Sequence, residues 1–249
     1  MTIHLMNCFT DNARWPSKLK TGMACLLVET SDGLLLVDTG LGLGDYAHPT
    51  RFTNFFRVIT IMPFDLNEAA VNRIRQLGFN PEDVRHIVLT HMHFDHMSGL
   101  PDFPHAKVHV HRREYDSFTD KKTLQWTDAA YIPRYIAHQP DFALYDVIDS
   151  KWYEFDAIRL PFQLEMYFIP LFGHSQGHCG VVIKTTDGWL FHAWDAGAVY
   201  NDISPAWLIR WALGPHDPHL RAFMKAHPEV LVTNSHMFPE FFAQHTVIT

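Results

Sequence analysis

Apolar and polar positions along the chain predict the same kind of hairpin twice. Two apolar runs, residues 24–29 and 34–37, flank an Asp-Gly turn, and residues 180–184 and 189–193 flank a second one. An Asp-Gly pair between apolar runs is a strong hairpin signal, because both residues tolerate the positive φ angles of a tight turn. The chain is therefore expected to contain two similar hairpins far apart in sequence.

A helix and a strand are predicted after the first hairpin. In residues 65–76, Asp65 and Glu68 have the spacing of an N-terminal capping box, and Gly78 follows as a stop signal. Residues 86–90 then read as a strand, because a short apolar run bounded by polar residues is typical of one.

The second hairpin is followed by the same order of elements. Asp217-Pro218 opens a predicted helix that runs to about residue 227, with proline at the first helical position. Residues 229–234 are the matching strand. Two hairpin, helix and strand units imply two sheets packed face to face with helices outside. The predicted fold is an α/β, four-layer αββα sandwich made of two pseudo-repeated halves.

Three segments do not fit this repeat: residues 41–64, 117–142 and 199–215. They are rich in aromatic side chains. They are expected either to shape a substrate pocket or a homodimer face, or to be helices that close the edge of the core, since aromatic stripes at helical spacing usually pack.

Length and composition favour one globular domain. The chain has 249 residues, of which 47% are hydrophobic and 19% charged, and no linker divides it, so residues 1–249 are expected to form a single domain. No apolar stretch reaches the ~18 residues of a membrane span. The start, residues 1–12, lacks the basic segment and apolar run of a secretion signal. A cytoplasmic location and no membrane partner are expected.

Charge and cysteine content narrow the function classes further. The formal net charge of −7 argues against nucleic acid as a partner, since such proteins normally present a basic face. Three scattered cysteines, Cys8, Cys25 and Cys179, are too few for a disulfide framework and are expected to be buried. The unusual number is 18 histidines, because imidazole is the commonest protein metal ligand.

Three of these histidines stand in six positions directly after the predicted strand 86–90: His91, His93 and His96, with Asp95 between the last two. Side chains alternate along a strand, so positions 91, 93 and 95 are expected to project to one side. Histidine and aspartate without cysteine suit zinc, manganese or iron in a catalytic site better than in a closed structural one.

These residues match the His-x-His-x-Asp-His signature of the metallo-β-lactamase fold superfamily, which the sequence resembles. Other motifs support the resemblance: Asp38-Thr39-Gly40 is similar to the superfamily's first turn, and residues 173–178 resemble its second histidine loop. Asp195 and His236 stand where the bridging carboxylate and the last ligand occur. The resemblance covers residues 22–240 and implies the αββα fold and a metal centre.

The resemblance also implies how the ligands divide between two Zn²⁺ ions, with Mn²⁺ or Fe²⁺ as substitutes. One ion would be held by three histidines, the other by one aspartate and two histidines, and an aspartate would bridge them; in that order the residues are His91, His93 and His174, then Asp95, His96 and His236, then Asp195. A bridging hydroxide would attack a small-molecule substrate. Asp95 would orient it and return a proton to the leaving group.

Within the superfamily the chain most resembles the acyl-homoserine lactonase branch, in the aromatic spacer after Asp38 and in residues 78–84 before the metal motif. That branch has a tyrosine three residues after the bridging aspartate, whereas Ala198 stands here; Tyr200 is the nearest candidate for that catalytic role. The expected activity is hydrolysis of a lactone or ester. A glyoxalase II type thioester hydrolase and a persulfide dioxygenase with a single iron remain alternatives.

A different hydrolase class has to be weighed as well. Residues 173–177 satisfy Gly-x-Ser-x-Gly, which would make Ser175 a nucleophile, and Asp195 and His236 follow in the order of α/β-hydrolases. A nucleophile elbow needs a strand before it and a helix after it. Here a strand, residues 180–184, is predicted next, so the metal site is favoured over the serine.

Overall fold

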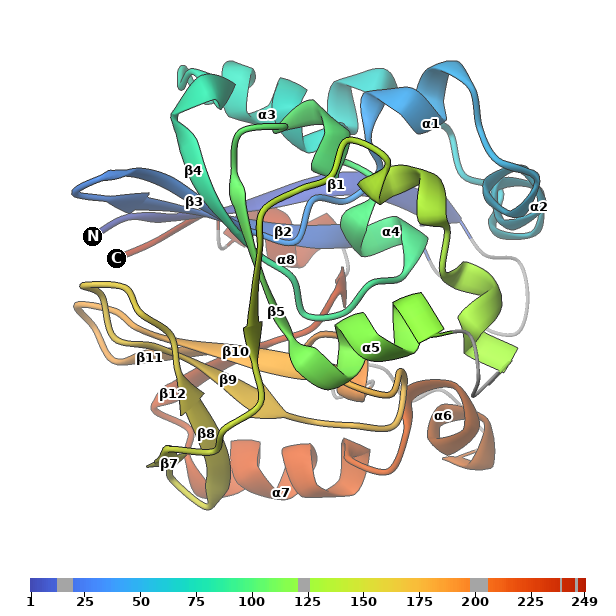
Figure 1. Cartoon of the computed structure of the whole chain (residues 1–249). Coiled ribbons are helices and arrows are strands. Elements are labelled where there is room, and N and C mark those ends of the chain that lie inside the picture. Colours follow the sequence, from blue (N-terminus) through green and yellow to red (C-terminus); the bar gives the residue numbers. More distant parts are fainter. Residues whose placement is uncertain (13–19, 121–125, 198–205, 238, 245) are drawn as a thin grey trace.

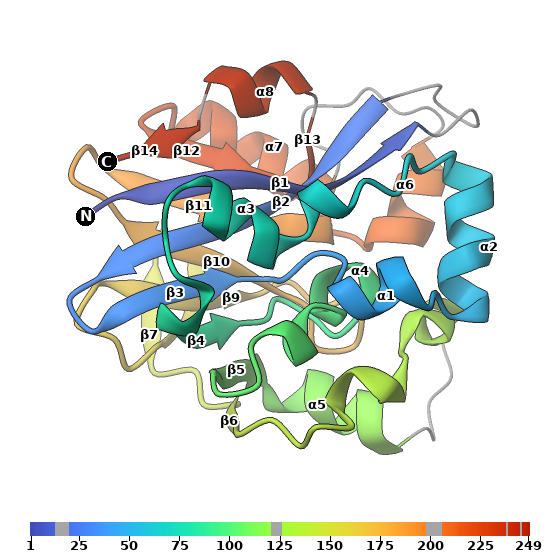
Figure 2. The ribbon, with the colours of Figure 1, turned by 90° about the horizontal axis from the view of Figure 1, so that it is seen from above.

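Two β-sheets lie face to face between outer layers of helices in the computed structural model of the chain (Figures 1 and 2). The structure describes residues 1–12, 20–120, 126–197, 206–237, 239–244 and 246–249. Of residues 126–127, 206–209, 236–237, 239–240 and 244 only the backbone is described. This architecture confirms the predicted αββα sandwich.

The first sheet runs in the order β14-β1-β2-β3-β4-β5-β6, with β13 paired to β2. Its strands are β1 (Ile3–Asn12), β2 (Lys20–Thr30), β3 (Gly33–Val37), β4 (Val84–Val88), β5 (Lys107–His111), β6 (Phe142–Tyr145), β13 (His236–Met237) and β14 (Val247–Ile248). The pairs from β3 to β6 are parallel, and the pairs β1–β2 and β2–β3 are antiparallel.

The second sheet runs in the order β12-β11-β10-β9-β8-β7. Its strands are β7 (Ser150–Trp152), β8 (Phe155–Arg159), β9 (Met166–Pro170), β10 (Cys179–Lys184), β11 (Trp189–His192) and β12 (Val230–Thr233). All pairs are antiparallel except β11–β12. The predicted hairpins are therefore β2–β3 in one sheet and β10–β11 in the other.

Helices cover the outer faces and the edge where the site lies. They are α1 (Leu43–Ala47), α2 (Arg51–Thr60), α3 (Ala70–Gln76), α4 (Phe94–Met97), α5 (Arg112–Asp120), α6 (Ala206–Leu213), α7 (Asp217–Ala226) and α8 (Pro239–Gln244). Figure 1 shows α3 above the first sheet and α7 below the second. Leu220 and Phe223 of α7 pack on the second sheet against Phe191 and Val182. The remaining core fills the space between the sheets and under α3.

The helix expected over residues 65–76 is divided in two. A 3₁₀ turn at Leu66–Glu68 precedes α3, and extended backbone at Ala69 separates them. The reason is that Glu68 does not complete a capping box: its carboxylate accepts hydrogen bonds from Thr10 (2.6 Å) and Asn7 (3.3 Å) on β1. A long-range contact therefore overrides the local signal.

Other expectations for the buried interior are confirmed. Cys8, Cys25 and Cys179 are free and buried. The predicted helix 217–227 and strand 229–234 agree with α7 and β12 to within about a residue.

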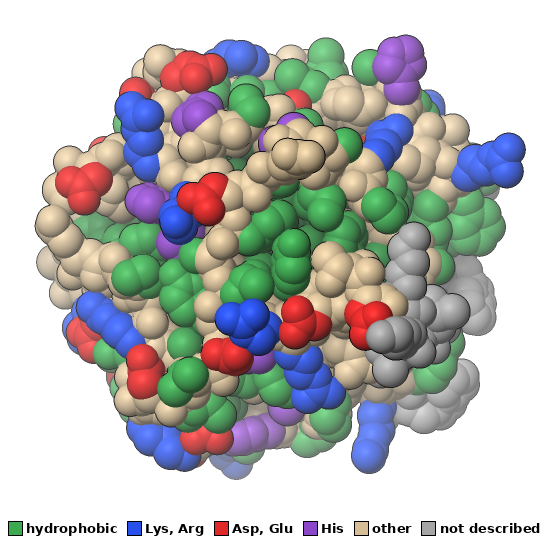
Figure 3. Space-filling view, viewed as in Figure 1, with side chains coloured by type: hydrophobic (Ala, Val, Ile, Leu, Met, Phe, Trp, Pro, Cys, Tyr) green, Lys and Arg blue, Asp and Glu red, His purple; other side chains and the backbone are tan. Residues whose placement is uncertain are grey.

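No helix in the described ranges is both long and apolar enough to span a membrane. Figure 3 shows acidic and basic side chains interspersed on one face, with no basic patch gathered there.

Candidate metal centre

The metal motif lies in the loop and helical turn that follow β4. The strand expected at residues 86–90 ends earlier, at Val88, so side-chain alternation does not bring the motif together as expected. Instead, His91 and His93 lie on the loop after β4, and Asp95 and His96 lie in α4. All four side chains are buried. The turn of α4 directs Asp95 and His96 to the same region as the two preceding histidines.

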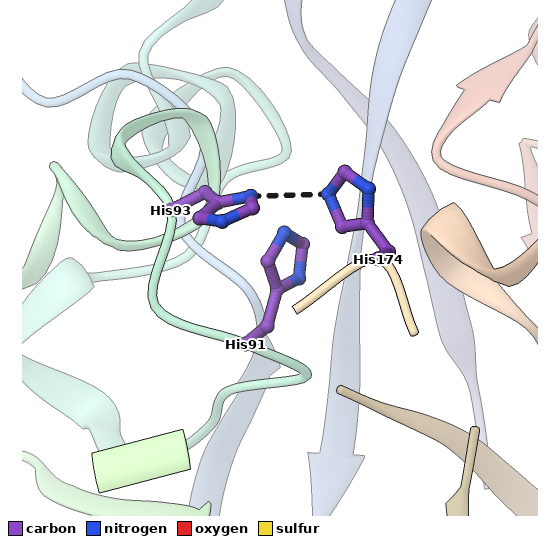
Figure 4. Close-up of side chains that lie close together, drawn as sticks. All are labelled: His91, His93 and His174. Atoms are coloured by element: carbon purple, nitrogen blue, oxygen red, sulfur yellow. Dashed lines mark hydrogen bonds between the residues drawn. The ribbon is translucent and has the colours of Figure 1, made fainter. Parts of the chain in front are cut away.

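Three histidines from two loops converge at the edge of the sandwich. His174 lies on the loop between β9 and β10, and it meets His91 and His93 with ring centroids 4.9 and 4.7 Å away. His93 Nδ1 and His174 Nε2 are 3.0 Å apart, as the dashed line in Figure 4 marks. One nitrogen from each of the three rings falls within 4.8 Å of the others, which suits a metal ion.

Asp195 belongs to a second group, which shares His91 with the first. The second group is formed by His91, His96 and Asp195, again with ligand atoms within 4.8 Å. Asp195 Oδ2 is 3.0 Å from His96 Nε2, 3.6 Å from His91 Nε2 and 3.5 Å from His174 Nε2. One carboxylate oxygen thus faces histidines of both groups, which is the position that a bridging ligand requires.

The structure places the other candidate residues less completely. Asp95 is buried, with Oδ2 3.9 Å from His96 Nε2. The backbone of His236 belongs to β13 and pairs with Met23 of β2; its side chain lies outside the description. Tyr200 lies outside the described residues. The structure therefore brings together His91, His93, His174, His96, Asp95 and Asp195 of the expected set.

The lowered pKa values of two histidines support metal ligation by this cluster. Burial and the neighbouring histidines hold the pKa values of His91 and His93 well below the usual value, so their rings are neutral and offer lone pairs. His91 Nε2 is buried without a hydrogen-bond partner among the described residues. Such an atom is costly unless something binds it. A divalent cation fits this donor set.

The pKa of His96 is shifted in the opposite direction. Burial disfavours its charge, but Asp38, Asp95 and Asp195 together raise its pKa well above the usual value. Three carboxylates around one imidazole are an excess of buried negative charge. A divalent cation at this position would balance that charge in place of a proton.

Residues behind the ligands fix the orientation of the rings. Asp38 Oδ2 is 2.6 Å from His96 Nδ1 and accepts a 2.7 Å hydrogen bond from the hydroxyl of Thr90. The backbone carbonyl of Ala212 lies 2.7 Å from His174 Nδ1. Such partners set which ring nitrogen keeps its proton and which faces the metal. Asp38 has φ of 54°, a strained conformation for a non-glycine residue and typical of functional turns.

His178 contacts the backbone of Asp195 and does not join the ligand cluster. Its Nδ1 is 3.2 Å from the carbonyl oxygen of Leu171, and its Nε2 accepts a 3.2 Å hydrogen bond from the backbone N–H of Asp195. Both ring nitrogens are thus engaged with backbone groups. Two histidines outside the centre, His109 and His111 of β5, are also buried, and their rings pack against Phe162 and Phe172.

Ser175 is fully buried and its hydroxyl donates a 2.8 Å hydrogen bond to Glu114 Oε2. β10 follows its loop, as the sequence predicts, so the strand–serine–helix geometry of a nucleophile elbow is absent at residues 171–184. The serine of the Gly-x-Ser-x-Gly match therefore serves as a hydrogen-bond donor to Glu114 and is not placed as a nucleophile. Glu114 is a residue that sequence analysis missed, since a single glutamate on an amphipathic helix gives no local signal.

An apolar pocket of about 360 Å³ opens over the ligand cluster. His93, Asp95, His174 and Asp195 reach it from the centre. The other lining residues are apolar and come mainly from the aromatic-rich segments: Phe52, Phe55, Phe56, Ile59, Phe94, Ala129, Ala130 and Leu213. The expectation that these segments shape a pocket is confirmed for α2 and for residues 129–130 and 213.

The wall formed by α2 is anchored to the metal motif itself. Phe52 and Phe56 pack edge-on against Phe94, with ring centroids 5.2 and 5.0 Å away. Such pairs prefer this geometry and add stability beyond their buried area. On the same helix, Phe55 remains 62% exposed at the pocket mouth, so its ring is available to a ligand.

Comparisons with known proteins agree with this architecture. Residues 23–236 match the Metallo-beta-lactamase superfamily. A probable metallo-hydrolase of Mycobacterium tuberculosis is 35% identical over 207 residues, which are 78% of this chain and 62% of that protein. The chain therefore spans less than two thirds of the length of this relative. An N-acyl homoserine lactonase of Bacillus cereus is 28% identical over 185 residues, covering 72% of this chain and 67% of that enzyme.

Solved structures show the same fold. An N-acyl homoserine lactone hydrolase with the product N-hexanoyl-L-homoserine bound at its catalytic metal centre has a TM-score of 0.64 at 18% identity, covering 97% of this chain and 95% of that one. A probable metal-dependent hydrolase from Staphylococcus aureus has a TM-score of 0.64 at 17% identity, covering 94% and 88%. By its fold, its ligand cluster and the match over most of its length, the chain belongs to the metallo-β-lactamase superfamily.

Proposed function

We propose that this protein is a metal-dependent hydrolase that opens a lactone or ester bearing an apolar acyl group. The observation that carries the proposal is the position of the histidine and aspartate cluster at the floor of an apolar pocket. The family membership and the relatedness to N-acyl homoserine lactonases support it.

The ligands would be used in two sets. His91, His93 and His174 would hold one ion, and Asp195 would be shared with a second ion at His96. Asp95, at the pocket floor, and His236 would complete the second set. Zn²⁺ suits this donor set, and Mn²⁺ or Fe²⁺ are alternatives. Divalent ions lower the pKa of bound water to about 7 and act as Lewis acids toward a carbonyl oxygen.

The chain's own residues would bind and orient the substrate. The acyl group would lie along Phe52, Phe55 and Ile59 of α2, with its carbonyl toward His93 and Asp195. A pocket of about 360 Å³ falls within the range of ~300 to 1,000 Å³ usual for small-molecule sites. Burial of the acyl group there would contribute ~25 cal/mol per Å² of apolar surface.

Asp95 is the proposed proton carrier of the reaction. Water adds its oxygen to the carbonyl carbon, the bond from that carbon to the ring oxygen breaks, and the water proton passes through Asp95 to the departing oxygen. Its burial beside His96 and its access to the pocket suit this transfer. Tyr200 is the proposed second group at the leaving oxygen, on the ground of its place after Asp195 in the sequence.

The test combines metal quantitation with a panel of substrates. Purified protein is loaded with Zn²⁺, Mn²⁺ or Fe²⁺, and turnover of lactones, esters and thioesters of graded acyl length is measured. We expect two ions per chain, turnover of lactones or esters, and loss of both metal and activity in His93→Ala. One iron per chain with oxygen uptake on a persulfide would replace the proposal with a dioxygenase, and preference for thioesters would replace it with a glyoxalase II type activity.

A further inference from the structure

A buried carboxylate on α5 connects every loop that carries a ligand of the three-histidine group. Glu114 has no exposed surface, and its two oxygens accept four hydrogen bonds. Oε1 accepts from the backbone N–H of Met92 (2.8 Å) and the hydroxyl of Tyr131 (2.9 Å). Oε2 accepts from the hydroxyl of Ser175 and the backbone N–H of Gly177, both at 2.8 Å. These five residues are called the Glu114 cluster below.

Two of the four donors to Glu114 are next to candidate ligands along the chain. Met92 lies between His91 and His93, and Ser175 is the residue after His174. The Met92 bond therefore holds the backbone between His91 and His93, whereas on the second loop the hydroxyl of Ser175 and the backbone N–H of Gly177 hold the residues that follow His174. A carboxylate has about four acceptor sites, so the four donors fill it. Hydrogen bonds to a charged group are each about twice as strong as neutral ones.

The loop that carries His174 packs closely against the start of α5, beside Glu114. A Cβ atom added to Gly177 would lie 2.2 Å from the backbone nitrogen of Glu114, so the second ligand loop rests directly on the start of α5. Tyr131 connects this cluster to the first loop from the other side, since its ring is 5.2 Å from the ring of His93.

From this geometry we infer that Glu114 is a positioning residue of the metal centre. It holds the loop of His91 and His93 and the loop of His174 in the relative arrangement that one ion requires. The inference rests on the proposed function, because it assumes that these three histidines bind a metal. Glu114 does not line the pocket, so it acts through the ligands and not on the substrate.

The test compares metal affinity in Glu114→Gln with that of the intact protein by Zn²⁺ titration against a chromophoric chelator. A glutamine offers one acceptor oxygen and an NH₂ group, so one pair of donors loses its acceptor. We expect Zn²⁺ affinity to fall about 10- to 100-fold, the range found when partners of metal ligands are lost. Glu114→Asp, which keeps the charge, should recover part of the affinity.

Two further measurements separate positioning from general stability. In the Co²⁺-loaded protein, Glu114→Gln should shift the visible absorption of the ion. At saturating metal it should lower kcat while KM changes less than twofold. Asp45→Asn is the matched control, because Asp45 is also a buried carboxylate, holding Thr53, Arg134 and Tyr135 but no ligand loop. It should lower the melting temperature and leave Zn²⁺ affinity and the Co²⁺ spectrum unchanged.

A milder variant decides the matter if Glu114→Gln does not fold. Tyr131→Phe/Ser175→Ala removes two of the four donors and leaves the carboxylate in place, and it should weaken Zn²⁺ binding about tenfold. Wild-type affinity and an unshifted Co²⁺ spectrum in a folded variant would overturn the inference while leaving the proposed function intact. Absence of Zn²⁺ binding in the intact protein would overturn both.

Discussion

Asp38→Asn should weaken metal binding by changing the tautomer of one ligand. Asp38 is fully buried, and its Oδ2 lies 2.6 Å from His96 Nδ1. The carboxylate only accepts hydrogen bonds, so it keeps a proton of His96 on Nδ1 and leaves Nε2, 3.0 Å from Asp195 Oδ2, as the nitrogen that a metal ion would bind. An asparagine that presents its NH₂ group to Nδ1 would move the ring proton to Nε2, where a metal ion has to bind.

If the asparagine rotates its amide, the ring proton can stay on Nδ1, but a different penalty appears. In the other orientation its NH₂ group faces the backbone N–H of Thr90, which now donates to Asp38 Oδ1 at 2.9 Å, so two donors would meet in a dry site. Leaving a buried donor unsatisfied costs about 1 to 3 kcal/mol. Either orientation therefore carries a penalty of about 1 to 3 kcal/mol, which corresponds to about a 5- to 150-fold loss of affinity.

The assay is a Zn²⁺ titration with metal quantitation at each step. The account predicts that the site containing His96 loses affinity while the site of His91, His93 and His174 changes less. Asp102→Asn is the control, since Asp102 is another largely buried carboxylate, accepting from the backbone N–H of Leu43 at 2.9 Å. A folded Asp38→Asn protein with two unaltered Zn²⁺ affinities would refute the reasoning about the tautomer.

Three further predictions address the pocket, the serine and pH. Phe55→Ala should raise KM for long-chain lactones or esters about fivefold and leave short-chain ones nearly unchanged, because a partly buried phenyl contributes roughly 1 kcal/mol of apolar contact; equal KM changes for both would contradict it. Ser175→Ala at saturating Zn²⁺ should retain most of kcat, whereas a chelator should abolish activity; the reverse result would identify a serine hydrolase. Burial raises the pKa of Asp102 to about 6, so the folded state binds a proton that the unfolded state releases near pH 4, and its stability falls as pH rises from 4 to 6. The test is the free energy of unfolding in urea, measured for Asp102→Asn and for the intact protein at several pH values. The value for the variant minus the value for the intact protein should rise by up to about 3 kcal/mol from pH 4 to 7. A difference that stays constant with pH would be inconsistent with the raised pKa.

The sequence predicts the layers of the fold because its hairpins and helix starts are local signals. The Asp-Gly turns of β2–β3 and β10–β11 and the proline at the start of α7 need only a few adjacent residues. The break between the 3₁₀ turn Leu66–Glu68 and α3 could not be predicted in this way, because Glu68 bonds to Thr10 on a distant strand. Strand β1 likewise carries no turn signal of its own.

The candidate ligands could be predicted because histidine and aspartate at motif spacing are uncommon and chemically specific. Their supporting residues could not. Glu114 stands far from the ligands in sequence and only the packing of α5 against both loops reveals its contacts. The early end of β4 at Val88 was also missed, since the apolar run 87–89 continues past the last paired residue.

Anomalous diffraction from crystals soaked with Zn²⁺ tests the central claim most directly. The account predicts two peaks at the pocket floor, one bounded by His91, His93 and His174 and the other by His96 and Asp95, with Asp195 between them. An absence of density there after soaking, or a metal bound elsewhere with these side chains unchanged, would contradict it.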